Sequence, residues 1–417
     1  MSEATTYRKL LANREFTGLF AAHSVSILGD VLSKVALSVL VYDRTRSAFM
    51  TALTFALGFL PQVLTAALAS AVVDLLPVRR IMLIGDTIRL LCVLSMTVPG
   101  IPVWALLVLV TVSGALTPMF RAARQSMLPE IVGMEGYVLA RSMFSGTVQL
   151  GQTLGFGLGG LLLVLVTPRT ALLLDAATFV FSLTMVLLMV RPRPAAAQRS
   201  AHTGGIIRAT TRGNWAVLGD PALRRLLLLQ WIPTALLVMP EGLAAPYADE
   251  LGGGTAAVGL LLAAPAVGTV LGEVIVARWM SPAARVRRIP LLVLVAAGPL
   301  IGFAIGPSLP VALALLFLSG IGSAFVLPLD QLFVERVPVS LRGRALTLSG
   351  AGSIAAQGTA LAAGGLLAEW LSLSWVFAAA GTASLASAAL LCGRRHWRRS
   401  GRSAPMASNQ PPLPVDS

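Results

Sequence analysis

Four charged residues lie inside stretches of the chain that are otherwise long and apolar. Asp30 and Lys34 fall in the middle of one such stretch, one helical turn apart. Glu241 and Glu273 are isolated acids in two later stretches, with no basic residue within four positions. A charge at the centre of a membrane-spanning helix costs about 2.5 to 3.5 kcal/mol, so these side chains should face protein or a water-filled cavity. A carboxyl group that is neutral in one conformation and ionised in another is a proton carrier.

Each of these residues also has a simpler interpretation. Asp30 and Lys34 can neutralise each other as a pair that only positions their helix. Glu273 is five residues from Arg278 and can reach the inner interface, and Glu241 can similarly reach the outer one. The sequence leaves both interpretations open.

The elements that must position these residues are membrane-spanning helices. The chain has 417 residues, of which 56% are hydrophobic and 12% charged, and this composition predicts a polytopic membrane protein within a lipid bilayer. Its net charge of +14 fits basic residues in cytoplasmic loops better than a nucleic-acid partner, so we expect no nucleic acid. Cys92 and Cys392 are far apart in apolar segments, which predicts no disulfide framework.

The hydrophobic runs predict an all-α fold of twelve transmembrane helices. Only Arg44, Arg46 and Arg169 fall in predicted outer loops, which places both termini in the cytoplasm. The N-terminal tail lacks a small-residue cleavage pattern and is expected to be retained as a signal anchor. The predicted spans are 16–41, 48–74, 80–98, 102–123, 138–166, 170–190, 223–246, 255–278, 289–306, 310–330, 344–368 and 374–393.

One long loop divides the predicted helices into six and six. We expect an N-terminal half at 1–190, a cytoplasmic linker at 191–222, a C-terminal half at 223–393 and a disordered cytoplasmic tail at 394–417. Asp220 and Pro221 are suited to cap and begin the seventh helix. Residues 206–218 of the linker form either an amphipathic surface helix or a solvated connection.

An internal repeat supports this division. Matching residues recur at offsets of 204 to 206, and because six spans separate the copies, they describe parallel repeats with a substrate site between them near the membrane midplane. Gln152, Gln357 and the Gly-Gly pairs are expected to serve helix packing. The matches are Pro61 with Pro265, Ser113-Gly114 with Ser319-Gly320, Gln152 with Gln357, and residues 159–162 with 364–367.

Signatures of enzymes and metal sites are missing from the sequence. It contains no P-loop, HExxH or GxSxG motif, and its three histidines, His23, His202 and His396, are scattered. We therefore expect no enzyme activity, no metal and no cofactor. Without a nucleotide-binding motif of its own, a pump of this kind uses an ion gradient.

The segment SAVVDLLPVRR, at the inner end of the second predicted span, resembles the signature of the major facilitator superfamily. Asp74, Arg79 and Arg80 fit the family pattern, whereas Ser70 and Pro77 replace its glycines. The resemblance implies that the three fitting residues form a cytoplasmic gate between the two halves. The alternative is that the two arginines are ordinary residues of an inner loop.

Further segments are similar to one branch of that superfamily, the drug and siderophore exporters that include macrolide-efflux proteins and the enterobactin exporter. They are SVSILGDVLSKVALSVLVYDRTRSA, LIGDTIRLL, RAARQSMLPEIV, LLDAATFVFS and RGRALTLSGAG. The resemblance implies an inner-membrane exporter that moves an antibiotic, drug or siderophore outward in exchange for protons. A proton-coupled importer and a non-transporting receptor or scaffold are the alternatives, and we expect a monomer.

Two further pairs of charges invite structural interpretations. Asp86 and Arg89 are three residues apart in the third span and are expected to form a local ion pair. Arg124 and Asp330 occupy matching positions at the inner ends of the fourth and tenth spans, with opposite charge. They predict an ion pair between the two halves.

Overall fold

The computed structural model describes residues 7–193, 217–338 and 341–392. Within its helices some side chains are not described, those of residues 67–75 among them. The expected surface helix at 206–218 lies almost entirely outside the described residues, and the expected tail at 394–417 lies wholly outside them.

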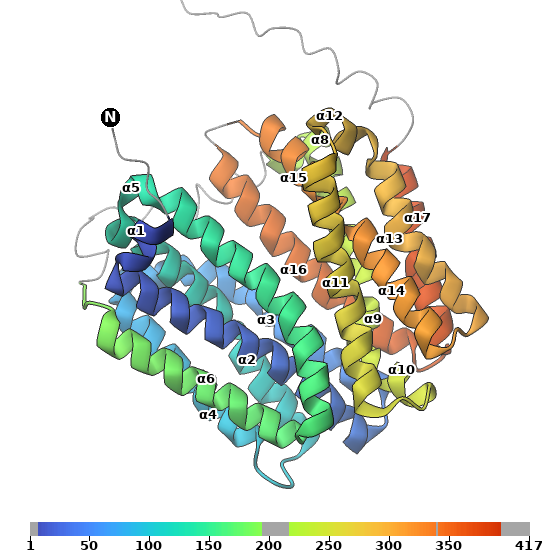
Figure 1. Ribbon diagram of the computed structural model, residues 1–417, viewed down its shortest axis with the longest axis horizontal. Helices are drawn as coiled ribbons and strands as arrows, with labels where there is room; N and C mark the ends of the chain where they lie inside the picture. Colours follow the sequence, from blue (N-terminus) through green and yellow to red (C-terminus); the bar gives the residue numbers. More distant parts are fainter. Residues whose placement is uncertain (1–6, 194–216, 339–340, 393–417) are drawn as a thin grey trace, which may run out of the picture.

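The described part of the chain up to Arg193 forms one group of helices, called here the N-terminal half (Figure 1). Long apolar sequences in lipid favour helices. The bilayer offers no hydrogen-bond partners to backbone N–H and C=O groups, whereas a helix pairs these groups with one another. The helices of this half are α1 (Tyr7–Ala12), α2 (Arg14–Thr45), α3 (Ala48–Leu75), α4 (Val78–Met96), α5 (Val103–Leu165) and α6 (Pro168–Met189).

The described residues from Val217 onward form the C-terminal half. Its helices are α8 (Pro221–Leu237), α9 (Met239–Gly242), α10 (Ala244–Glu250), α11 (Gly254–Trp279), α12 (Pro282–Arg287), α13 (Ile289–Ile301), the 3-10 helix η2 (Gly302–Ile305), α14 (Leu309–Ser323), α15 (Val326–Arg336), α16 (Arg342–Leu367) and α17 (Leu373–Cys392).

These helices cover the twelve predicted spans and confirm the all-α fold class. Among the described residues, eight helical stretches are long and apolar enough to cross a membrane by themselves. The other four spans are α4, the second part of α5, α13 with η2, and α16.

The ends of several helices differ from the expectation. The predicted loop between spans four and five is helical, and the chain reverses at Gly133, whose φ of 69° suits a residue without a side chain. The seventh span is broken into α8, α9 and α10, with Pro240 at the first turn of α9. Hydrophobic runs locate apolar residues but do not show where the backbone turns.

The expected start of the seventh span is confirmed. Asp220 caps α8, because its Oδ1 accepts hydrogen bonds from the backbone N–H of Ala222 at 2.7 Å and of Leu223 at 3.3 Å. Pro221 occupies the first turn, where its missing N–H leaves no hydrogen bond unmade.

The repeat appears as two equivalent close approaches of helices. A methyl group on Gly114 of α5 would lie 3.0 Å from the Gly58 carbonyl oxygen of α3. One on Gly320 of α14 would lie 2.9 Å from the carbonyl carbon of Pro265 in α11. Because glycine has no side chain, the backbones of the two helices can come into direct contact. Close packing of this kind is typical of helices that associate in lipid.

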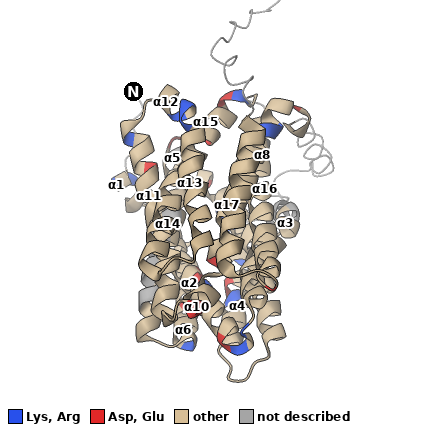
Figure 2. Cartoon of the chain, turned by 90° about the vertical axis from the view of Figure 1, so that its right-hand side faces the viewer, with Lys and Arg blue, Asp and Glu red and all other residues tan. Residues whose placement is uncertain are grey.

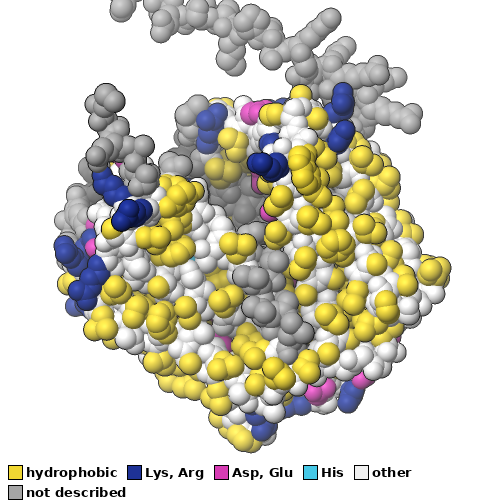
Figure 3. All heavy atoms as spheres, in the orientation of Figure 1, with side chains coloured by type: hydrophobic (Ala, Val, Ile, Leu, Met, Phe, Trp, Pro, Cys, Tyr) yellow, Lys and Arg dark blue, Asp and Glu magenta, His cyan; other side chains and the backbone are white. Residues whose placement is uncertain are grey.

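Charge and hydrophobicity are arranged as a membrane requires. Charged side chains are gathered mainly at the two ends of the helices (Figure 2), and broad apolar surface lies between them (Figure 3). Leu64, Leu165, Ile305 and Leu390 are each at least 77% exposed, although they are fully apolar. In a lipid bilayer such residues need no partner.

The two halves meet along two pairs of helices, α3 with α16 and α5 with α11. We call the end of the molecule that carries α1, α12 and α15 the upper end, and the end that carries α10 and residues 97–102 the lower end (Figure 1). The candidate site lies between the halves.

Candidate functional site

A cavity of about 540 Å³ follows α2 through the interior of the molecule. Its lining along α2 runs from Leu19 to Leu37, which spans about 27 Å at 1.5 Å per residue. Helices α3 to α6 supply most of the other walls, and Gly350, Ile354 and Gln357 of α16 supply a wall from the C-terminal half. Two halves that move relative to each other would therefore change the shape of this cavity.

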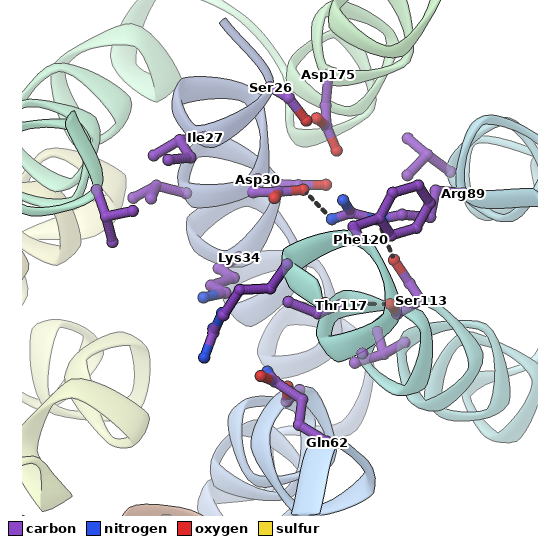
Figure 4. Close-up of a pocket in the computed structure, with 18 of the residues that line it drawn as sticks. Ser26, Ile27, Asp30, Lys34, Gln62, Arg89, Ser113, Thr117, Phe120 and Asp175 are labelled. Carbon is purple, nitrogen blue, oxygen red and sulfur yellow. Dashed lines mark hydrogen bonds and ion pairs between the residues drawn. The ribbon is translucent and has the colours of Figure 1, made fainter. Parts of the chain in front are cut away.

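The centre of the cavity holds an ion pair between Asp30 of α2 and Arg89 of α4 (Figure 4). The Arg89 side chain is 11% exposed, and its guanidinium carbon lies 4.7 Å from the ring centre of Phe179. Its Nε also lies 3.4 Å from the hydroxyl of Ser113. A carboxylate, a ring and a hydroxyl thus hold one guanidinium group in place.

This arrangement corrects two expected pairs. Asp30 pairs with Arg89 instead of Lys34, and Arg89 does not form its ion pair with Asp86. The Asp86 carboxylate instead accepts a hydrogen bond of 2.7 Å from Ser182 of α6. Helical spacing identifies neighbours along one helix, whereas here the better-placed partners lie on adjacent helices.

Asp175 of α6 is a site residue that the sequence interpretation passed over. It lines the cavity, is 1% exposed and accepts a hydrogen bond of 3.3 Å from Thr178. Figure 4 shows it on the far side of Asp30 from Lys34. The signal was present, because an acid within an apolar span marks a functional site by default.

Lys34 and Glu241 lie near each other across the two halves. The Lys34 ammonium group is 5.2 Å from the ring centre of Phe59, and its charge is attracted by both Asp30 and Glu241. It forms no ion pair with either in the described structure. Glu241 lies in α9, at the break in the seventh span, and Glu273 lies in α11; neither is among the residues that line the cavity.

The expected gate residues are described only in part. Asp74 lies in α3, but its side chain is among those not described. Arg79 donates a hydrogen bond of 2.8 Å to the carbonyl oxygen of Leu187 in its own half. Arg80 is exposed. The gate role of these three residues stays a prediction.

The expected ion pair between Arg124 and Asp330 is not formed in this structure. Arg124 contacts His23 of α2, and Asp330 accepts a hydrogen bond of 2.7 Å from Gln230 in its own half. The two residues lie on different halves at the upper end, and each contacts a residue of its own half.

A separate charge cluster ties the end of α6 to α2 at the upper end. Arg193 pairs with Glu15, including a contact of 2.9 Å, and its Nε lies 3.0 Å from Glu130. The hydrogen bond with Glu15 raises the pKa of the Arg193 guanidinium above its ordinary value. This cluster fixes the start of the predicted linker on the N-terminal half.

At the lower end, an acid of the C-terminal half binds the turn that follows α2. Asp249 of α10 accepts a hydrogen bond of 3.0 Å from the Tyr42 hydroxyl and forms an ion pair of 3.2 Å with Arg46. The sequence interpretation missed this acid, since its partners are two hundred residues away along the chain.

A second acid of the C-terminal half makes an equivalent contact. Glu369, which follows α16, accepts hydrogen bonds of 3.0 Å from the Ser47 hydroxyl and 3.3 Å from the Phe49 backbone N–H. Just above it, Phe55 of α3 packs with Leu361 of α16 in a buried cluster. The two halves are therefore joined at the lower end.

We expect the double variant Asp249→Asn, Glu369→Gln to loosen this closure. The exposed Asp249–Arg46 ion pair contributes up to about 1 kcal/mol, and a typical hydrogen bond such as those of Glu369 contributes about 0.5 to 1.5 kcal/mol, so the population with a separated lower end should rise by about tenfold. Spin labels at Trp104 and Leu371, in a protein whose native cysteines are replaced by alanine, would report a longer distance by double electron–electron resonance. The matched variant Asp43→Asn removes an exposed acid of the same turn and should leave the distance distribution unchanged. An unchanged distribution in the double variant would contradict a closing role.

Comparison with known proteins agrees with this architecture. The family model described as "Major Facilitator Superfamily" matches residues 19–329 and 241–414 of the chain. The chain belongs to the major facilitator superfamily. The fold of this superfamily member is also found in solved structures: the nucleoside transporter NupG has a TM-score of 0.69 at 14% identity, covering 90% of this chain and 98% of that one. A peptide transporter POT variant in complex with alafosfalin has a TM-score of 0.70 at 13% identity, covering 93% and 95%.

A curated relative is similar over most of its length. The multidrug efflux pump Tap of Mycolicibacterium fortuitum is 27% identical over 374 residues, which are 87% of this chain and 90% of that protein. With the family established, this major facilitator protein is a multi-pass membrane transporter of a small molecule and not an enzyme.

Proposed function

We propose that the protein exports an amphipathic small molecule, such as an antibiotic, drug or siderophore, across the inner membrane in exchange for protons. The supporting observation is the cavity of the N-terminal half that α16 of the C-terminal half helps to line, because it combines apolar and polar walls and contains the Asp30–Arg89 ion pair. The similarity to proteins named multidrug efflux pumps supports the same direction of transport. We expect it to act as a monomer.

The proposed orientation follows from the distribution of basic residues, with the upper end and both termini in the cytoplasm. The lower end, held by Asp249 and Glu369, then faces outward and is closed. Transport would proceed as residues 1–190 rock against 223–393, with 191–222 as the linker. In the opposite state the upper end would close, and we expect Asp74, Arg79 and Arg80 to act there as the cytoplasmic gate.

Asp30 is the proposed proton carrier. In this conformation its carboxylate is in contact with the Arg89 guanidinium group. A shift of α2 relative to α4 would separate the two groups and leave the carboxyl group of Asp30 to exchange a proton with the cavity. Glu241 is the second candidate, because its charge and that of Lys34 attract each other across the moving halves.

A vesicle assay tests the function and its direction. Inverted membrane vesicles containing the protein should accumulate a member of a panel of antibiotics, dyes and siderophores only while a proton gradient is present. Substrate addition should also collapse part of that gradient, as proton exchange requires. Gradient-driven accumulation only in right-side-out vesicles would identify an importer. Ligand binding without transport in either vesicle would identify a receptor or scaffold.

A further inference from the structure

The charges that line the cavity are not balanced. Its basic residues are Lys34, Arg89, Arg121 and Arg124, and its acids are Asp30, Asp86 and Asp175.

The acids all have partners of their own. Arg89 neutralises Asp30, while Asp86 and Asp175 are 5% and 1% exposed and are held by hydroxyl groups of their own half. Among the described residues, none of the other three basic side chains forms an ion pair with a carboxylate. The excess charge within the cavity is therefore positive.

Two of these basic residues form a site toward the upper end. Arg121 and Arg124 are three positions apart on α5 and so lie on one face of the helix. Arg124 lies with its guanidinium carbon 4.8 Å from the ring centre of Phe144, and Arg121 is exposed at the cavity lining. A guanidinium group that is largely removed from water without a counter-ion is costly, so this position favours an anion.

His23 holds one of these arginines in place. Its Nδ1 contacts Nη1 of Arg124, and because arginine stays protonated, Nδ1 must accept that hydrogen bond. The proton of the neutral ring is then on Nε2, which is buried and has no hydrogen-bond partner among the described residues. The site thus offers a ligand the donors of Arg121 and Arg124 and no acceptor, with the His23 ring beside them.

We propose that Arg121 and Arg124, the latter held in place by His23, bind the anionic group of the transported amphiphile, a phosphate, sulfonate or carboxylate. The inference rests on the proposed function and narrows its substrate class to anionic or zwitterionic molecules. The apolar part of the ligand would lie deeper, against Phe59 and Phe120. From His23 to Lys34 the cavity extends about 16 Å along α2, which accommodates a drug-sized body.

Binding to purified protein in a neutral glycoside detergent tests this inference without a gradient. Isothermal titration calorimetry would compare 1-naphthyl phosphate with 1-naphthyl glucoside, trimethyl(1-naphthyl)ammonium and inorganic phosphate. We expect 1-naphthyl phosphate to bind at least about tenfold more tightly than each of the others. Arg124→Gln should weaken its binding by about tenfold or more, as loss of a charge-assisted hydrogen bond does, and leave the glucoside within twofold.

Matched variants separate this inference from its alternatives. Arg141→Gln removes an exposed arginine of the same helix that does not line the cavity, and should change no affinity. If Arg124 serves only to pair with Asp330 when the upper end closes, Arg124→Gln and Asp330→Asn would impair transport equally and neither would change phosphate binding. Unchanged binding of 1-naphthyl phosphate in both variants would overturn the inference. So would tighter binding of trimethyl(1-naphthyl)ammonium than of 1-naphthyl phosphate, or binding of inorganic phosphate as tight as that of 1-naphthyl phosphate. Loss of phosphate binding in Arg124→Gln together with no transport by the wild type would overturn the proposed function and leave this inference standing.

Discussion

Replacement of Arg89 by glutamine lowers proton-driven transport at least about 100-fold. The variant leaves Asp30 without its cation in a cavity that two other acids, Asp86 and Asp175, also line. Removing one partner of a buried ion pair costs about 3 to 5 kcal/mol, and about 2.7 kcal/mol already corresponds to a factor of 100. Asp30 then lacks the contact that holds its carboxyl group in this conformation, so the exchange proposed for it should fail.

The double variant Asp30→Asn, Arg89→Gln decides what the pair does. If the two residues only neutralise each other, removing both charges together restores packing and transport. If Asp30 carries the proton, the double variant stays inactive in gradient-driven uptake, while ligand binding to purified protein persists. We expect the second outcome.

The measurement is uptake into inverted vesicles at matched amounts of protein, with folding checked by size-exclusion chromatography in detergent. Arg141→Gln is the matched control, because it removes an exposed arginine of the same half and should retain full transport. Wild-type uptake by Arg89→Gln, with folded protein in both samples, would show that the pair is dispensable.

Replacement of Gly320 by valine prevents the C-terminal half from assembling. Gly320 of α14 lies against the backbone of α11, and an added methyl group would come within 2.9 Å of the Pro265 carbonyl carbon and the Thr269 amide nitrogen. Backbone atoms cannot move aside as a flexible side chain can. Overpacking a well-packed interior costs about 1 to 3 kcal/mol, and a valine placed against backbone should lie at or beyond the upper limit.

Gly298→Val is the matched control for this prediction. It lies in α13, where an added methyl group would meet only the end of the Leu294 side chain at 3.8 Å. We expect Gly298→Val to give nearly normal amounts of monodisperse protein and Gly320→Val to give little or none. Equal yields and equal melting temperatures would show that α11 and α14 tolerate separation.

The class of protein and the order of its helices could be predicted from the amino-acid sequence. Apolar runs long enough to cross a bilayer identify spans from composition alone, because lipid leaves a helix no other way to satisfy its backbone. Local chemistry was equally readable: Asp220 caps the helix that Pro221 begins, since both effects act within three residues. The recurrence of Gly114 as Gly320 was readable as part of the repeat, but the structure was needed to show that both glycines lie against the backbone of a neighbouring helix.

The partners of the charged residues could not be predicted from the sequence, because they depend on how the helices pack. Asp30 is four residues from Lys34 but pairs with Arg89, and Asp249 pairs with Arg46 from the opposite half of the chain. Helical periodicity gives the direction of a side chain relative to its own helix. The residue that it contacts depends on which other helix packs against that face and on the position of that helix along the membrane normal. The free energy of an ion pair in an apolar interior depends on contact within a few ångströms and on desolvation, and neither is encoded in spacing along the chain. The same reason explains why Arg124 contacts His23, and Asp330 contacts Gln230, although the two residues occupy matching positions of the repeat.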